Sequence, residues 1–249
     1  MTLNYIKIKN FRNFEGETEI KFNENINVIL GNNDTGKTNI VNAISWCLYG
    51  EELVNTHENN HFDIININAN DVYVECGFTI GGKDFIVSRK YSNNKCEVVF
   101  DYGDKLFNVE EIISKNDFIN NFFTGEFPVD LNELSKEDEE KLNRLMARFF
   151  TEDCYTVRDG DVYDNDKLMS GYLSDGDSLI ISLFAKFVSV NGDFPLIFEQ
   201  IFARLDNNKK KSAINSLMYY NSQVILLASD LSYDENLKQF LVFNLNNGW

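Results

Sequence analysis

The feature that most limits what this chain can fold into is a glycine-containing loop between a strand-like and a helix-like segment. Residues 31–38 read Gly-Asn-Asn-Asp-Thr-Gly-Lys-Thr and match the pattern G-x-x-x-x-G-K-[ST]. The apolar run 26–30 precedes the loop, and apolar residues recur at helical spacing over 38–49. A loop that matched the pattern by chance would not be expected to lie between a strand and a helix. The motif in this context therefore predicts the phosphate-binding loop of an α/β protein.

The residue types in this loop share one chemical purpose. Gly31 and Gly36 permit backbone conformations that turn N–H groups toward phosphate oxygens, and the helix start adds its positive dipole. Lys37 is expected to reach the β- and γ-phosphates, and Thr38 to ligate Mg²⁺. The residues predicted to contact nucleotide here are Asn32, Asn33, Asp34, Thr35, Gly36, Lys37, Thr38 and Asn39.

The remaining pattern predicts an antiparallel sheet fused to an α/β layer. Strands are expected at 5–8 and in a meander at 72–80, 84–91 and 96–102. The continuous apolar runs 196–198 and 224–228 predict strands buried on both faces, and a last strand is expected at 240–245. Helices are expected at 108–121, from Ser135 through Phe149 behind a capping-box-like sequence, and at 177–190 and 208–220, with acidic turns at 159–166.

Composition narrows the class of protein. The 249 residues carry 23 basic and 39 acidic side chains, a formal charge of −16, which argues against coating nucleic acid but leaves a local DNA contact open. No apolar run approaches a membrane span, and residues 1–5 lack the pattern of a signal peptide, so a cytoplasmic protein without a membrane partner is expected. The four widely spaced cysteines are expected to be reduced, buried thiols.

Several further motifs resemble those of the SMC/RecF/RecN-type ABC ATPase heads of DNA repair and chromosome maintenance. Residues 6–14 (IKIKNFRNF) and 42–50 (NAISWCLYG) flank the phosphate loop as in the N-terminal half of such heads. Residues 173–177 (LSDGD) resemble the ABC signature, 194–200 (FPLIFEQ) the Walker B strand, and 203–206 (ARLD) the D-loop. Because these motifs occur in the family's order, the resemblance covers nearly the whole chain.

The resemblance implies one ABC-ATPase head over 1–249. Its fold would be α/β, with an N-terminal antiparallel β lobe fused to a P-loop α/β core and a helical signature lobe. The expected parts are an N-terminal lobe at 1–127, a short replacement for the family's coiled-coil insertion at 128–172, and a C-terminal lobe at 173–249. At about 1.5 Å per residue, a helical hairpin in the middle segment would be only a stub.

In such heads two subunits sandwich two molecules of ATP with Mg²⁺. The resemblance therefore implies an ATP-dependent dimer with a second copy or a homologous head, in which Ser174 and the Gly176 N–H contact a γ-phosphate across the dimer. Because ADP lacks that phosphate, the dimer would be a nucleotide switch for a protein effector. Arg12 is implied to lie near the nucleotide, although a solvated surface arginine is equally open.

The departures from the family pattern concern hydrolysis. Where the family has Asp and then a catalytic Glu, this chain has Glu199 and Gln200. Glu199 can still hold Mg²⁺-bound water, but Gln200 cannot take a proton from the attacking water, which typically costs on the order of 10²–10⁴-fold in rate. The resemblance implies three further nucleotide-site residues: Thr124 in the Q-loop, Asp206 in the D-loop and Ser229 at the switch position. The family usually has Gln at the position of Thr124 and His at the position of Ser229.

These observations rank three functions. The first is a Mg·ATP switch with slow or absent hydrolysis, acting in DNA repair or in genome or anti-phage defence. The second is an active ATPase in which Glu126, Glu199 or a partner's residue supplies the carboxylate, and the third is a transporter-type ATPase subunit. Two weaker features stay open. Residues 209–211 (Lys-Lys-Lys) are a solvated helix face or a contact for a partner or nucleic acid, and His57 and His61 belong to a surface loop or bind a metal.

Overall fold

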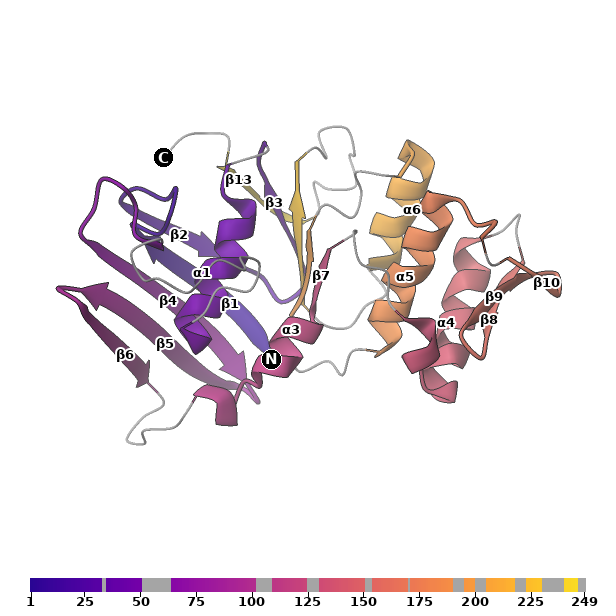
Figure 1. Ribbon diagram of the computed structural model, residues 1–249, viewed down its shortest axis with the longest axis horizontal. Helices are drawn as coiled ribbons and strands as arrows, with labels where there is room; N and C mark the ends of the chain where they lie inside the picture. Colours follow the sequence, from indigo (N-terminus) through magenta and orange to yellow (C-terminus); the bar gives the residue numbers. More distant parts are fainter. Residues whose placement is uncertain are drawn as a thin grey trace. The chain divides into compact units, whose positions relative to one another are not determined.

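The computed structural model describes residues 1–32, 35–50, 64–101, 109–124, 130–150, 154–169, 171–189, 195–199, 205–217, 223–229 and 240–245. The chain divides into two compact units, one made of 1–122, 193–199 and 222–249 and the other of 123–192 and 200–221. Each unit is therefore assembled from segments that are distant in the sequence (Figure 1). The lobes at 1–127, 128–172 and 173–249 were defined by the order of the sequence motifs, and they stay a prediction.

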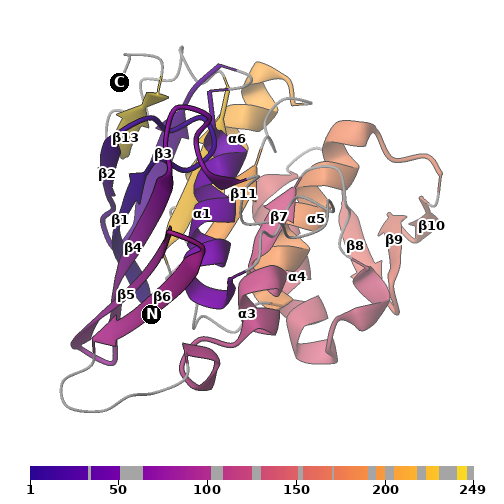
Figure 2. The same cartoon turned by 60° about the vertical axis from the view of Figure 1, so that its left-hand side comes forward.

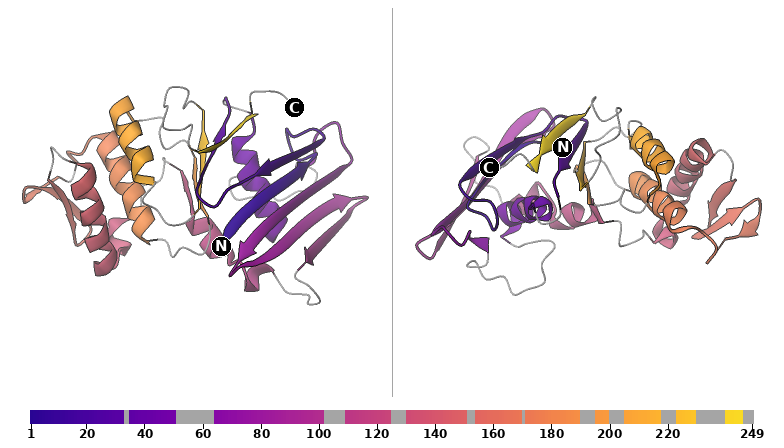
Figure 3. Two further views of the ribbon diagram at one scale, coloured as in Figure 1. Left: turned by 180° about the vertical axis from the view of Figure 1, so that it is seen from behind. Right: turned by 90° about the horizontal axis from the view of Figure 1, so that it is seen from above.

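The first unit contains an antiparallel sheet with the strand order β2-β1-β4-β5-β6, seen from behind in Figure 3. Its strands are β1 (Thr2–Lys9), β2 (Glu17–Lys21), β4 (Asp71–Ile80), β5 (Lys83–Ser92) and β6 (Lys95–Asp101). Side chains alternate along β1, so that Ile6 and Ile8 are fully buried whereas Tyr5 and Lys7 lie on the other face. The predicted meander is confirmed, and β2, whose residues alternate between exposed and buried, is a strand that was not predicted.

Glu75 joins β4 to its neighbour β1 on the outer face of this sheet. Its carboxylate accepts hydrogen bonds from Tyr5 Oη and Lys7 Nζ, each at 2.9 Å, and from the hydroxyl of Tyr73. Burial raises the pKa of Glu75, but the hydrogen bonds from Tyr73, Lys7 and Tyr5 outweigh burial, and the net pKa lies below its ordinary value. The ionised carboxylate therefore contributes to the pairing of β1 and β4.

The second sheet of this unit has the order β13-β3-β12-β11-β7. Its strands are β3 (Ile26–Leu30), β7 (Phe122–Thr124), β11 (Leu196–Glu199), β12 (Val224–Ala228) and β13 (Leu241–Asn244). The strands β13, β3, β12 and β11 are parallel, and the register pairs Ala228 with Leu30 and Leu227 with Glu199. The carboxyl ends of these four parallel strands meet at one edge, and the buried strands predicted at 196–198 and 224–228 are confirmed.

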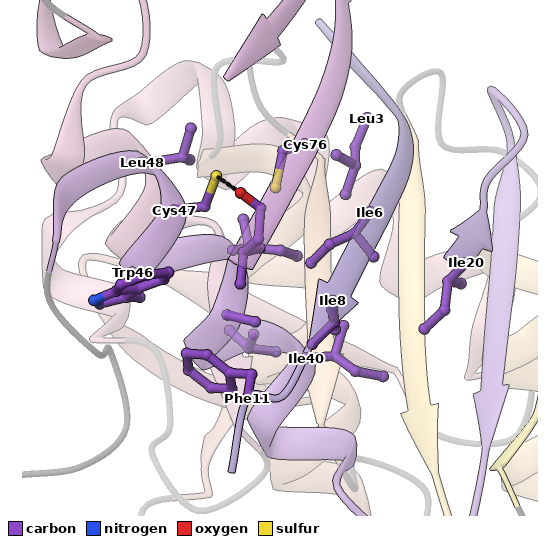
Figure 4. Close-up of a cluster of buried hydrophobic side chains, with 14 of the residues drawn as sticks. Leu3, Ile6, Ile8, Phe11, Ile20, Ile40, Trp46, Cys47, Leu48 and Cys76 are labelled. Carbon is purple, nitrogen blue, oxygen red and sulfur yellow. Dashed lines mark hydrogen bonds between the residues drawn. The ribbon is translucent and has the colours of Figure 1, made fainter. Parts of the chain in front are cut away.

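Helix α1 (Lys37–Tyr49) is buried along nearly its whole length and contacts β4, β5 and β12 (Figure 2). Trp46 and Cys47 from α1 join side chains of β1 and β4 in the core of the unit (Figure 4). Arg89 on β5 donates to the carbonyl oxygens of Cys47 at 3.2 Å and Leu48 at 3.4 Å, at the end of the helix. This contact satisfies terminal carbonyl groups of α1 and holds the helix against the antiparallel sheet.

Two expectations for this unit need correction. All four cysteines are free, but only Cys47 and Cys76 are buried, whereas Cys96 and Cys154 are exposed, the last in the second unit. The single helix expected at 108–121 is divided into η1 (Val109–Glu111) and α3 (Lys115–Asn120). The division occurs because Ser114 has an extended backbone and its side chain accepts from the N–H of Asp117, which starts a new helix.

The second unit contains α4 (Lys136–Phe149), α5 (Asp175–Ser189) and α6 (Asn207–Leu217), preceded by η2 (Leu131–Glu133). A three-stranded antiparallel sheet of order β10-β9-β8 lies between α4 and α5 in the sequence: β8 (Tyr155–Arg158), β9 (Asp161–Asp164) and β10 (Lys167–Leu168). Helix α4 packs against α5 and β8.

The described part of the segment 128–172, expected as a short replacement for the coiled-coil insertion, holds η2, the helix α4 expected behind Ser135, and a small sheet that was not predicted. The acidic turns expected at 159–166 are also corrected, because β9 occupies their centre and only Asp159, Gly160, Asn165 and Asp166 adopt positive φ at the turns. None of the helices in the described part of the chain is long and apolar enough to cross a membrane.

Candidate functional site

The phosphate loop begins at the carboxyl edge of the parallel sheet. The N–H of Gly31 donates to the carbonyl oxygen of Ala228 at 3.1 Å, which anchors the start of the loop beside the end of β12. An ideal Cβ on Gly31 would lie 2.2 Å from Thr35 Oγ1 and 3.1 Å from Leu245 Cβ. Glycine is required at this position because the loop folds back on itself.

The loop ends where α1 begins, at Gly36. This residue has φ 100° and ψ 15°, in the left-handed region, and no side chain caps the helix. Thr35 Oγ1 donates to the carbonyl oxygen of Asn32 at 2.9 Å, which closes the loop from within. The geometry is that of a backbone loop leading directly into a helix N-terminus, the arrangement that receives a phosphate.

Lys37 is a buried charged side chain, with 4 % exposure. Its Nζ donates to the carbonyl oxygens of Gly31 at 2.5 Å and Asn32 at 2.7 Å. These oxygens hold the ammonium group over the loop and stabilise its charge in a buried position. The positive charge that the sequence assigned to phosphate binding is thus already turned toward the loop.

Thr38 and Glu199 come together although they are distant in the sequence. The hydroxyl of Thr38 donates to Oε1 of Glu199, which is 7 % exposed at the end of β11. A hydroxyl oxygen next to a carboxylate is the hard-oxygen donor set that suits Mg²⁺. The two residues predicted from the sequence as metal ligands are therefore in contact, and their oxygen atoms are of the type that binds Mg²⁺.

The segment that follows β1 lies against the start of α1. Asn13 accepts from Asn39 Nδ2 at 2.8 Å, and its amide would lie 2.6 Å from an ideal Cβ on Gly36. Sequence reasoning missed Asn13; its place directly after Arg12 was the available signal. Arg12 itself has φ 49°, and its N–H donates to the carbonyl oxygen of Ile64 at 2.7 Å. The backbone of this segment is therefore held close to the phosphate loop.

The signature-like residues lie in the second unit, at the start of α5. Ser174 Oγ accepts from the N–H of Asp177 at 3.1 Å and donates to Asp177 Oδ2 at 2.6 Å. Gly176 belongs to the first turn of α5. Asp206, in the D-loop-like sequence, caps α6, because its Oδ1 accepts from the N–H of Lys209 at 2.9 Å.

The other candidate residues are placed less fully. Thr124 ends β7, and the exposed Ser229 follows β12 directly. Asn33, Asp34, Gln200, His57 and His61 lie outside the described residues. Within the described ranges, no group of three or more His, Cys, Asp or Glu side chains is arranged to hold a metal ion.

Comparison with known proteins identifies the family of the chain. Residues 5–242 match the model of the AAA domain family AAA_23. The chain is 27 % identical over 148 residues to the DNA double-strand break repair Rad50 ATPase of Archaeoglobus fulgidus, covering 59 % of this chain and 16 % of that protein. It is 30 % identical over 113 residues to the DNA replication and repair protein RecF of Clostridium kluyveri, covering 45 % and 28 %. The chain thus spans well under a third of the length of these two relatives.

Solved structures show the same fold. The SMC head domain from Thermotoga maritima superposes with a TM-score of 0.76 at 18 % identity, covering 98 % of this chain and 94 % of that chain. An SMC head bound to the C-terminal winged-helix domain of ScpA superposes with a TM-score of 0.70 at 15 % identity, covering 93 % and 90 %. At these identities the likeness concerns the fold, and it confirms the α/β head predicted from the sequence.

Proposed function

The chain belongs to the AAA domain family and is an ATPase head of the SMC/RecF type; on that premise, we propose that it binds Mg·ATP and acts as an ATP-dependent dimerisation switch. One observation carries the proposal: the contact between the hydroxyl of Thr38 and the carboxylate of Glu199, at the edge of the sheet where the phosphate loop begins. This contact supports the proposal because it sets a hydroxyl oxygen and a carboxylate, the oxygen ligands that suit Mg²⁺, next to the start of the helix that follows the phosphate loop.

Each residue then has a defined part in binding. Lys37 would exchange loop carbonyl oxygens for the β- and γ-phosphates, and Gly36 would let backbone N–H groups turn toward them. Thr38 and Glu199 would hold Mg²⁺, which, when bound, neutralises phosphate charge. Arg12 and Asn13 are proposed to border the same nucleotide because their segment lies against Gly36 and Asn39.

The switch requires a second subunit. Ser174 and the N–H of Gly176 are proposed to contact the γ-phosphate of ATP held by a second copy or a homologous head. The hydroxyl of Ser174 can rotate from Asp177 toward a phosphate oxygen while still accepting from the N–H of Asp177. Because ADP offers no γ-phosphate, the dimer would form with ATP and separate with ADP.

Hydrolysis is proposed to be slow. Gln200 stands where the family places the carboxylate that polarises the attacking water, and an amide cannot accept the water's proton. The ATP-bound dimer would therefore be long-lived, and its signal would pass to a protein effector. The relatives named above are DNA repair proteins, which supports a role in DNA repair or genome maintenance. The same switch would serve anti-phage defence.

The decisive experiment measures mass and chemistry in one sample. Light scattering on a sizing column is run without nucleotide, with Mg·ATP and with Mg·ADP, while phosphate release is followed. The expected result is a dimer with Mg·ATP alone and little phosphate release. A chain that stays monomeric and binds no nucleotide would refute the proposal.

A variant separates the switch from an active ATPase. Gln200→Glu restores the carboxylate and is expected to raise phosphate release by about 10²–10⁴-fold. Glu199→Gln is the matched change at the neighbouring position, and it should weaken Mg²⁺ binding. Steady release by the unmodified chain that persists in Gln200→Ala and is lost in Lys37→Ala would mean that another carboxylate acts as the base.

A further inference from the structure

The start of α5 is linked to α6 by a lysine that the signature motif does not include. Lys209 Nζ lies 2.6 Å from Asp177 Oδ1 and 3.5 Å from Ser174 Oγ. The side chain of Asp177 is 11 % exposed and that of Lys209 is 31 % exposed. An ideal Cβ on Gly176 would lie 3.5 Å from both Cδ and Nζ of Lys209, so this side chain runs alongside the signature turn.

A second helix of the same unit shows that the cap itself does not require this lysine. At the start of α4, Ser135 Oγ accepts from the N–H of Asp138 at 3.1 Å and donates to Asp138 Oδ2 at 2.6 Å, the same distances as in α5. The lysine that meets Asp138 is Lys141, one turn further along the same helix. Only the cap at the signature, of these two, takes its cation from a different helix.

Lys209 is also placed by the D-loop-like sequence. Asp206 caps α6 by accepting from the N–H of Lys209, and the carbonyl oxygen of Asp206 accepts from the N–H of Lys210. The backbone of Lys209 is therefore fixed at the first turn of α6, and its side chain reaches back to α5. A connected series of contacts joins Asp206, Lys209, Asp177 and Ser174.

The contact between Lys209 and Asp177 would reduce the electrostatic repulsion between the Asp177 carboxylate and an approaching triphosphate. A triphosphate brought to Ser174 and Gly176 would approach the carboxylate of Asp177, and two anions at short distance in a partly buried place repel. The carboxylate also holds the proton of Ser174 Oγ that a phosphate oxygen would need. A cation bound to Asp177 lowers both costs, because it balances the charge and remains as a partner when the hydroxyl rotates away.

We propose that Lys209 is a positioning residue for ATP-dependent dimerisation, which neutralises Asp177 so that the signature turn can receive the triphosphate of a second copy. The inference rests on the proposed function and adds a residue from α6 to the composite site. Within the basic run 209–211, the inference concerns Lys209 alone; Lys211 is exposed.

The test measures the Mg·ATP concentration that gives half-maximal dimer by light scattering, together with nucleotide affinity of the dilute monomer and thermal unfolding. Lys209→Met keeps the apolar stem and removes the charge; it is expected to raise the half-maximal concentration at least about tenfold, with the monomer's affinity unchanged. Lys209→Arg should stay within about threefold of the unmodified chain. Lys141→Met is the matched control, because it removes the cation beside the equivalent cap of α4, and it should leave dimerisation unchanged.

A double variant distinguishes charge balance from a structural tether between α5 and α6. Lys209→Met with Asp177→Asn still lacks the ion pair but has no bare carboxylate, so dimerisation should recover to within about threefold. A double variant as defective as Lys209→Met would overturn the inference in favour of a tether, and a fully dimerising Lys209→Met would overturn it directly. A wild-type chain that stays monomeric in Mg·ATP would instead overturn the proposed function, and the inference with it.

Discussion

The phosphate loop and the signature turn each open a helix, but they open it by different means. Helix α1 starts at Gly36, whose left-handed backbone leaves the helix without a side-chain cap. Helix α5 starts at Ser174, whose hydroxyl caps the N–H of Asp177 and is bound in turn by the Asp177 carboxylate. The start of α1 is therefore set by the backbone of a glycine and the start of α5 by a side-chain cap, so that Gly36 and Gly176 have different conformational roles.

The largest effect is expected when the positive charge of Lys37 is removed from the phosphate loop. Lys37→Ala should weaken ATP binding to the monomer by about 100-fold, because a charge-assisted contact with the phosphates is lost. Binding of a fluorescent ATP analogue to dilute protein measures it. Lys209→Met is the matched variant at the second site and should leave this monomer affinity unchanged; an equal loss in both would mean that the two regions do not have separate roles.

The two motif glycines should respond to alanine with opposite signs. Gly36→Ala places a side chain at φ 100° and against the amide of Asn13, which should lower the free energy of unfolding by about 1–3 kcal/mol. Gly176→Ala lies in a helix, where an added Cβ meets Lys209 at an ordinary 3.5 Å, so it should raise that free energy by about 0.5–1 kcal/mol. Urea unfolding without nucleotide compares them, and the same sign for both would contradict the distinction.

Loss of the serine cap should have a moderate effect. Ser174→Ala removes a helix cap and is expected to lower the free energy of unfolding by about 1 kcal/mol. Ser135→Ala removes the same cap geometry from α4 and should cost a similar amount. Only Ser174→Ala should also impair ATP-dependent dimerisation in light scattering. If both variants impair dimerisation equally, stability rather than the signature hydroxyl is responsible.

The smallest effect is expected for a substitution in the antiparallel sheet, at a residue that belongs to neither the phosphate loop nor the signature turn. Glu75→Gln should lower the free energy of unfolding at pH 7 by about 1 kcal/mol or less, because hydrogen bonds to a carboxylate are replaced by weaker ones. The folded-state pKa of Glu75 is lowered, so its contribution is present above the ordinary glutamate pKa and is lost as the pH falls through the folded value. The difference from the unmodified chain should therefore disappear on acidification. ATP-dependent dimerisation should not change.

Local patterns were sufficient for much of the fold. The run 26–30, the loop 31–38 and the following helix were predicted together, because strand, glycine turn and helix periodicity are all encoded over short distances. The meander was predicted for the same reason. The helix expected at 108–121 failed at Ser114, where a local cap overrides the apolar spacing, and the acidic segment 159–166 failed because pairing with a neighbouring strand is not visible in its own composition.

The site was predicted as a set of residues but not as a set of contacts. The motif identified Lys37 and Thr38, and the resemblance identified Glu199 and Ser174, since each occurs in a recognisable local sequence. Asn13 was not identified, because its proximity to Gly36 depends on how the segment after β1 folds back. Lys209 was identified only as a member of a basic run. Its contact with Asp177 was not predicted, because nothing in the sequence of that run points to this residue.

The sequence by itself determined the strand, phosphate loop and helix over 26–49, the meander of β4, β5 and β6, and the amide at position 200, because these depend on residue type and short spacing. Only the tertiary structure decided that Thr38 meets Glu199, 161 residues away, and that Lys209 meets Asp177, 32 residues away. Packing of the parallel strands produces the first contact and the approach of α6 to α5 produces the second. Such contacts depend on the simultaneous burial of many side chains, which no short segment of the chain encodes.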